Sequence, residues 1–343
     1  MADVALGPGL TVLAGPNGAG KTAFLESVYL LSRGRSFRGR RFGSLVQHGE
    51  RCARVEGWMD DEGVTERLVW ESRASGDGAE SGAKGDGPGV GLSHRLQVRL
   101  VSEATHTLVE GEPSIRRRFV DWNVFHVEPG FGALRARYRR VGAQRNAWLR
   151  AGGKGHPVWD RPYAQVLAEL AAARAGFVRS MATAVEALTA EIGWYEELGL
   201  EWRTAVGDAD ETLERLRGAR DADVQRGFSG VGPSRDDLRV NLGGRRWVGS
   251  RGETKIVGVL LQLAAQAVVQ SVTGRHAVWL VDDLSAELGD DASARLADIL
   301  TQRADQVILT ALPGRQPLRW RAMFHVEQGA VQPSPRPLRA VAG

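Results

Sequence analysis

The stretch GPNGAGKT at residues 15–22 matches the pattern G-x-x-x-x-G-K-[ST] of phosphate-binding loops. The residues before it, Leu10 to Ala14, form a short apolar run that predicts a buried strand. The residues after it, Ala19 to Ser32, carry apolar side chains at helical spacing and predict an amphipathic helix. A loop between a buried strand and a helix is the setting that phosphate binding requires, so we expect an α/β fold with a nucleotide site.

Each residue type in this loop suits that chemistry. Glycines allow backbone N–H groups to converge on phosphate oxygens, and the N-terminus of the following helix favours negative charge. The lysine reaches the β- and γ-phosphates, and the threonine hydroxyl binds Mg²⁺. We predict that the nucleotide contacts Gly15, Pro16, Asn17, Gly18, Ala19, Gly20, Lys21 and Thr22. Of these, Lys21 is a predicted catalytic residue and Thr22 a predicted metal ligand.

A second apolar run, Ala277 to Val281, ends in two carboxylates, Asp282 and Asp283. Ligands of open α/β sheets bind at the carboxyl ends of strands, so we expect Asp282 to hold Mg²⁺ through water and Asp283 to act as the general base. Many ATPases of this type have a glutamate at the second position. An aspartate is shorter and a base must lie within about 2.6–3.2 Å of its proton, so we expect slow hydrolysis. A helix cap or surface turn is the alternative role for these aspartates.

The chain between these runs changes from strand-like to helical patterns. Strands are predicted at 54–59, 64–71, 96–100, 107–109 and 238–242, helices from residue 114, at 161–192 and at 255–272, and a mobile hairpin tip at the glycine-rich 74–91. We therefore predict an ATPase head formed by residues 1–113 and 226–330, an inserted helical lobe at 114–225, and a flexible tail at 331–343.

The composition excludes several classes of protein. Cys52 is the only cysteine among 343 residues, so an internal disulfide is impossible and a cysteine-based zinc site is not expected. We find no run of about 18 uncharged apolar residues and no secretory signal, so we expect no membrane span and a cytosolic protein. The basic residues are nearly all arginine, which fits either a biased codon usage or a phosphate-binding surface.

Five further segments occur in a specific order: GRSFR at 34–38, RRRFVDW at 116–122, QRNA at 144–147, VGPSRDDL at 231–238 and SRGETK at 250–255. With the phosphate loop and the run that ends at Asp283, they resemble the RecF family of bacterial recombinational repair over about residues 9 to 330. Phosphate loops are common, but the GRSFR, RRRFxDW and QRNA segments at these relative positions are specific.

The resemblance implies a fold and an activity. RecF-like proteins have an ATPase head similar to those of ABC and SMC proteins, with a mostly helical second lobe and no long coiled coil. ATP with Mg²⁺ joins two copies, so that each nucleotide contacts the phosphate loop of one copy and the signature segment of the other, here Ser250, Gly252 and Glu253. The homodimer binds DNA, particularly at single-strand gaps, and with RecO and RecR it helps RecA to replace single-strand-binding protein. Hydrolysis is slow.

The sequence departs from the family pattern in places. Only eight residues precede Gly9, whereas the family has a strand and an FRNY segment before its phosphate loop. Glu253 places a carboxylate where the family has a neutral amide, and Ser234 stands where it has histidine. Ala286 and Gly289 replace a serine and an aspartate. These departures leave ATP binding intact but affect the prediction of dimerisation and turnover.

Three alternatives stay open at this point. A degenerate RecF-like protein would bind ATP and DNA without turnover. A transporter ATPase would need an LSGGQ-type signature, which the segment at 250–255 lacks. The signature residues could instead form an ordinary helix cap.

The roles of two groups of arginines also stay open. Arginines at 35 and 38 could contact phosphates or lie in a solvated turn. Arginines at 116–118 could follow a DNA backbone, although we favour a role in holding the lobes together.

Overall fold

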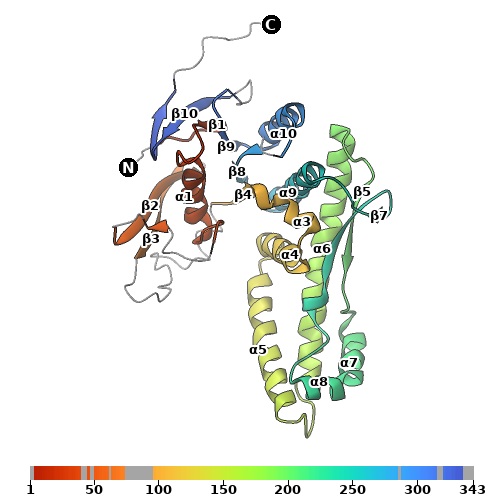
Figure 1. The fold of residues 1–343 in the computed structure, drawn as a ribbon. Helices are drawn as coiled ribbons and strands as arrows, with labels where there is room; N and C mark the ends of the chain where they lie inside the picture. The colour runs from red at the N-terminus through yellow and green to blue at the C-terminus, as the bar shows by residue number, and fades with distance from the viewer. Residues whose placement is uncertain are drawn as a thin grey trace. The chain divides into compact units, whose positions relative to one another are not determined.

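The computed structural model describes residues 4–39, 45–46, 50–61, 63–73, 96–284, 287–314 and 320–334. The chain separates into two compact units, of which unit 1 comprises residues 1–103 and 275–343, and unit 2 comprises residues 104–274 (Figure 1). The predicted boundaries at 113/114 and 225/226 differ from these. Residues 226–274 belong to unit 2 because their strand and long helix pack against its other helices.

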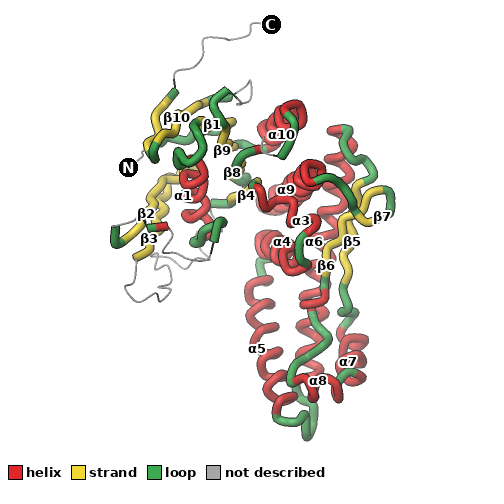
Figure 2. Tube along the Cα trace, in the orientation of Figure 1, coloured by secondary structure: helices red, strands yellow, loops and turns green. Residues whose placement is uncertain are grey.

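The described part of unit 1 is built on a sheet with the strand order β11-β10-β1-β9-β8-β4 (Figure 2). Neighbouring strands are parallel except for β10 and β11. The strands are β1 (Gly9–Ala14), β4 (Val98–Val101), β8 (Val278–Val281), β9 (Gln306–Ala311), β10 (Ala322–Glu327) and β11 (Ala330–Pro333). Because β1 lies between β9 and β10, the loop that follows it emerges in the middle of the carboxyl edge.

A helix and a hairpin pack with this sheet in one hydrophobic core. Helix α1 (Lys21–Arg33) and the hairpin of β2 (Cys52–Asp61) and β3 (Val64–Arg73) contribute Leu25 and Trp70, which are fully buried with Leu13 of β1. The indole N–H of Trp70 donates to the carbonyl of Gly34, where α1 ends. Helix α10 (Asp290–Arg303) completes the described elements. The predicted strands and helix of this unit are confirmed, while the predicted hairpin tip at 74–91 lies outside the described residues.

Unit 2 is organised around the 33-residue helix α6 (Asp160–Ile192), which confirms the predicted long helix. Its apolar residues, including Leu167 and Ala171, pack against other helices and a small sheet of order β5-β6-β7. The elements are α3 (Thr107–Glu110), α4 (Pro113–Val127), α5 (Phe131–Arg150), β5 (Leu198–Arg203), α7 (Ala209–Gly218), α8 (Arg220–Arg226), β6 (Asp237–Leu242), β7 (Arg245–Arg246) and α9 (Arg251–Thr273).

The strand predicted at 107–109 is wrong, because these residues form the single helical turn of α3. Leu108 and Val109 are both buried, and α3 packs against α9. A short apolar run has the same pattern in a buried strand and in one buried helical turn, so periodicity cannot separate them.

Helix α9 bears on the expectation that no segment of the chain spans a membrane. Among the described residues it is the one helix that is long and apolar enough to cross a membrane by length and composition alone. Two thirds of its most apolar window is buried inside the protein, and it packs against α3, α4 and α6. The helix therefore supplies a large part of the core of unit 2, and burial within the fold accounts for its apolar character.

A buried ion-pair cluster joins α4, α6 and β6 in unit 2. The Arg174 guanidinium donates to both carboxylate oxygens of Asp121 at 2.7 and 3.0 Å and to Asp236 at 2.8 Å. Arg116 makes a second bidentate pair, with Asp237, at 2.7 and 3.1 Å. Arg117 donates to the carbonyl of Asp236. The arginines at 116 and 117 thus have structural roles, but these contacts lie inside unit 2, whereas the favoured interpretation placed them between the lobes. The partners come from the RRRFVDW and VGPSRDDL segments.

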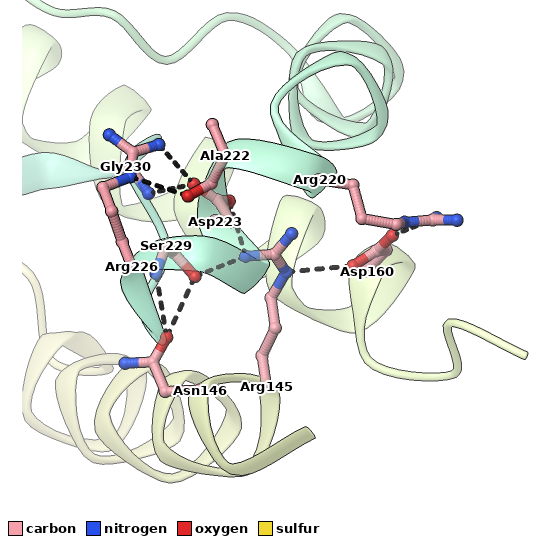
Figure 3. Close-up of polar contacts among 9 residues, drawn as sticks. All are labelled: Arg145, Asn146, Asp160, Arg220, Ala222, Asp223, Arg226, Ser229 and Gly230. Atoms are coloured by element: carbon pink, nitrogen blue, oxygen red, sulfur yellow. Dashed lines mark hydrogen bonds and ion pairs between the residues drawn. The ribbon is translucent and has the colours of Figure 1, made fainter. Parts of the chain in front are cut away.

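A second cluster holds the end of α5 against α6 and α8 (Figure 3). The fully buried Arg145 donates to Asp160 at 2.9 Å and to Asp223 at 3.1 Å. The neighbouring Asn146 accepts from both the backbone N–H and the hydroxyl of Ser229. The QRNA segment therefore fixes one end of α5 through buried charge pairs and an amide, because an unpaired buried charge would be costly.

We predict that Arg174→Met strongly destabilises unit 2. The substitution leaves the carboxylates of Asp121 and Asp236 buried without their partner, which costs about 3–5 kcal/mol. Urea unfolding followed by tryptophan fluorescence measures this loss. Arg179→Met removes an exposed arginine from the same helix, five residues further along the chain, and should cost less than about 0.5 kcal/mol. Equal effects of the two substitutions would contradict the role given to the cluster.

Candidate nucleotide site

The phosphate loop adopts a conformation that only glycine accommodates at its key positions. Gly18 and Gly20 have φ values of 78° and 107°, which side-chain-bearing residues rarely adopt. A Cβ atom at Gly15 would lie 2.2 Å from the carbonyl oxygen of Val326 on β10. The glycines thus allow the loop to turn sharply while it lies directly against the neighbouring strand.

The turn between β10 and β11 also contacts the loop. The N–H of Gly329 donates to the carbonyl of Ala19 at 2.9 Å, and Gly329 lies 3.3 Å from where a Cβ of Gly20 would be. Sequence reasoning missed β10 and included residues 331–333 of β11 in a flexible tail, which is wrong for those residues. The short alternation FHVE was the only available signal for β10, and pairing with β1 makes this strand part of the site.

The first turn of α1 has backbone N–H groups without side-chain caps. Its N-cap is Gly20, no side chain caps it, and the first turn contains no acidic residue. Lys21 folds back over the loop, and its ammonium donates to the carbonyls of Gly15 at 2.8 Å and Pro16 at 2.9 Å. Burial lowers the pKa of Lys21, and the carboxylates of Asp283 and Asp282 raise it in part. This arrangement concentrates N–H donors and a cation where a phosphate group would bind.

Asp282 connects three segments at the carboxyl edge of the sheet. Its Oδ1 atom accepts hydrogen bonds from the hydroxyl of Thr22 at 3.0 Å and from the hydroxyl of Thr310 at 2.9 Å. Its own N–H donates to Val101 at the end of β4. The hydroxyl of Thr22 and the carboxylate of Asp282 thus place two oxygen atoms side by side, and oxygen atoms are the donors that Mg²⁺ prefers.

Asp283 follows in a left-handed backbone conformation, with φ of 45°. Aspartate tolerates this conformation better than most residues, because its short polar side chain can make local hydrogen bonds. Its N–H donates to the hydroxyl of Thr310 at 2.9 Å. Asp283 is also the larger of the two carboxylate influences on the pKa of Lys21, so its charge lies near the loop.

Thr310 belongs to the candidate site, and sequence reasoning did not identify it. It is 2% exposed near the end of β9, where its hydroxyl contacts both Asp282 and Asp283. The available signal was a threonine late in the otherwise apolar run VILTA. Only the sheet order, which makes β9 the neighbour of both β1 and β8, shows that this hydroxyl reaches the two aspartates.

The predicted signature residues lie together in unit 2, at the start of α9. Ser250 caps the helix: its hydroxyl accepts from the N–H of Glu253 at 3.3 Å, and the Glu253 carboxylate accepts from the backbone N–H and hydroxyl of Ser250 at 2.8 and 2.7 Å. These bonds from Ser250 lower the pKa of Glu253. The structure thus contains the helix cap considered as an alternative. Lys255, the last residue of the signature segment, is 1% exposed.

The remaining sequence candidates have local roles in the described structure. In the GRSFR segment the hydroxyl of Ser36 donates to the Glu26 carboxylate, and the ring of Phe37 packs edge-on against Tyr29. A phosphate contact by the arginines of this segment stays a prediction. Gly289 is the N-cap of α10, and Ala286 lies outside the described residues.

Comparison with known proteins agrees with this architecture. The family model described as "RecF/RecN/SMC N terminal domain" matches residues 1–330. The chain is 33% identical to the DNA replication and repair protein RecF of Pseudomonas putida, over 94% of this chain and 92% of that protein. It is also 33% identical to the RecF protein of Pseudomonas aeruginosa, over 94% and 91%.

Solved structures show the same fold. A structure of the recombination mediator protein RecF with ATP, from the RecFOR pathway, aligns with a TM-score of 0.79 at 20% identity and covers 97% of this chain and 93% of that one. An SMC head bound to the C-terminal winged-helix domain of ScpA aligns with a TM-score of 0.52 at 14% identity. The fold is therefore that of an SMC-like ATPase head with a second, mostly helical unit, as predicted. Together with the relatives at 33% sequence identity and the matching family model, it establishes that this chain belongs to the RecF family of DNA replication and repair proteins.

Proposed function

We propose that this chain is an ATP-switched DNA-binding protein of recombinational repair. ATP would join two copies, and the homodimer would bind gapped DNA and, with RecO and RecR, promote the loading of RecA in the cytosol. Membership of the RecF family supports a role in DNA replication and repair. The observation that carries the nucleotide-dependent part is the convergence of Lys21 and Thr22 with Asp282 at one edge of the sheet.

Nucleotide binding would replace the present hydrogen-bond partners of Lys21 by phosphate oxygens. A phosphate oxygen is a stronger acceptor for the Lys21 ammonium than the two backbone carbonyls that hold it in this structure, because the bond is assisted by charge on both sides. Thr22 and Asp282 would hold Mg²⁺, with phosphate oxygens and waters as its other ligands. The metal would neutralise charge on the phosphates, and Thr310 would keep the Asp282 carboxylate oriented.

Hydrolysis would depend on Asp283 as the base that activates water. Its side chain is short and its backbone is in the left-handed region, which favours a second candidate function: ATP and DNA binding without turnover. An ATPase assay with gapped DNA separates the two. Measurable ATP turnover that Asp283→Asn abolishes supports the first candidate, an ATP switch that hydrolysis resets. ATP and DNA binding without turnover supports the second candidate.

The first prediction concerns the phosphate contact of Lys21. Lys21→Ala should weaken ATP binding by roughly 10- to 100-fold, because a hydrogen bond between charged groups contributes about 1.5–3 kcal/mol. Isothermal titration with ATP and Mg²⁺ measures the change. Lys154→Ala, which removes an exposed lysine from unit 2, is the matched control and should bind as the parent does. Unchanged affinity in the Lys21 variant would contradict the site.

The second prediction concerns Thr310. Thr310→Val keeps the shape of the side chain but removes the hydroxyl that orients Asp282, so the affinity for ATP in Mg²⁺ should fall about two- to tenfold. Affinity in EDTA should change little. Thr301→Val removes a hydroxyl that bonds only to a carbonyl within α10 and serves as the control. An equal loss with and without Mg²⁺ would show that Thr310 does not act through the metal ligand.

The third prediction concerns Glu253. In the proposed dimer its carboxylate faces the γ-phosphate bound to the other copy, so Glu253→Gln should tighten the ATP-dependent dimer about two- to fivefold, the range for an exposed charge pair. Glutamine can also complete the helix cap with Ser250, so the stability of the free chain should not change. Sedimentation with ATP and Mg²⁺ measures dimerisation. An unchanged dimer would place Glu253 away from the nucleotide.

A further inference from the structure

We infer that the outward face of α5 in unit 2 binds the sugar–phosphate backbone of duplex DNA. The inference deepens the proposed function and rests on it, because it assigns DNA binding to a particular surface. Figures 1 and 2 show α5 along one flank of α6, with α7 on the opposite flank. One face of α5 is therefore packed within unit 2, and the other face is left for a ligand.

The charge of α5 is unusual within this chain. Its 20 residues include six arginines and no aspartate or glutamate. Helices α6 and α7 of unit 2, and α10 of unit 1, all contain acidic residues as well as arginines. A general bias toward arginine codons would add arginines to every helix, but it would not remove the acids from one. The excess of positive charge is thus a property of α5 itself.

The arginines of α5 divide into structural and exposed groups. Arg145 is fully buried in the cluster of Figure 3. Arg137 pairs with Glu169, and Arg135 lies 3.8 Å from Asp121. Arg139 and Arg140 are exposed, and within the described part of the chain their side chains form no hydrogen bond or ion pair. These two guanidinium groups have all their donors available for phosphate oxygens.

The residues between these arginines favour a nucleic acid over a protein partner. At 3.6 residues per turn, Ala136, Ala143 and Ala147 share the face opposite the buried Val141, and all three are exposed. Small side chains permit close approach of a DNA backbone to the helix. The exposed large apolar side chains of the described chain all lie on other elements, whereas protein interfaces centre on such anchors.

Buried charge keeps this face in position. The bonds of Arg145 to Asp160 and Asp223 fix the C-terminal part of α5 against α6 and α8. Arg139 and Arg140 lie one to two turns before this anchor, so their backbone is held while their side chains reach solvent. The conformational entropy of the helix backbone is already lost when the chain folds, so DNA binding has to order only the arginine side chains.

The test is the salt dependence of binding to a fluorescently labelled random-sequence duplex, with ATP and Mg²⁺ present, measured by anisotropy. In the Arg139→Ala/Arg140→Ala variant two phosphate contacts are lost, so the slope of log K against log salt should become shallower by about 1.8. If the affinities converge at 1 M salt, this slope corresponds to roughly 60-fold weaker binding at 0.1 M. Arg139→Lys/Arg140→Lys should retain the parental slope, since it retains both charges.

The control is Arg161→Ala/Arg217→Ala, which removes two exposed arginines of unit 2 that pair with Asp210 and Glu214. It changes the net charge equally and should keep the parental slope. If the parent binds duplex and the α5 variant keeps its slope, or the control loses as much, the α5 surface is wrong while the proposed function stands. If the parent itself does not bind DNA, the proposed function fails first. If the α5 variant binds DNA as the parent does but no longer binds a protein partner, the inference is also wrong.

Discussion

The hydrogen bonds that Asp282 accepts from Thr22 and Thr310 join the phosphate loop to two strands of the central sheet. They form because β1, β9 and β8 are adjacent and parallel, so that their carboxyl ends meet at one edge. The rest of the candidate nucleotide site lies at this edge: Lys21 lies over the loop, where burial lowers its pKa and both carboxylates raise it in part, and the β10–β11 turn donates a hydrogen bond to the loop.

Unit 2 depends on a different constraint, the pairing of buried arginines. The segments that distinguish the RecF family from other phosphate-loop proteins supply Arg116, Asp121, Arg145 and Asp236, which are all buried in ion-pair clusters. Such clusters contribute little net stability compared with apolar packing, but they allow only one set of partners. These residues of the motifs therefore have a structural role within unit 2.

The Ser250–Glu253 cap illustrates how one residue type can serve two roles. A glutamate three residues after a serine completes a capping box, as a glutamine would, so helix formation does not distinguish this signature from the family pattern. The difference is one of charge alone. In the free chain the backbone N–H and the hydroxyl of Ser250 donate to the Glu253 carboxylate. In the proposed dimer the same two groups would donate to a γ-phosphate.

The sequence by itself determined the phosphate loop, the strands and helices that flank it, the aspartates after β8 and the long helix α6, because each depends on local spacing and residue type. Tertiary structure decided the rest. Thr310 became a site residue, β10 became the support of the loop, and the residues at 107–109 became a helix because distant segments pack beside them. The same holds for the arginines: composition showed an excess of them, but only packing separated the buried Arg145 and Arg174 from the exposed Arg139 and Arg140, since burial depends on contacts between residues far apart in the chain.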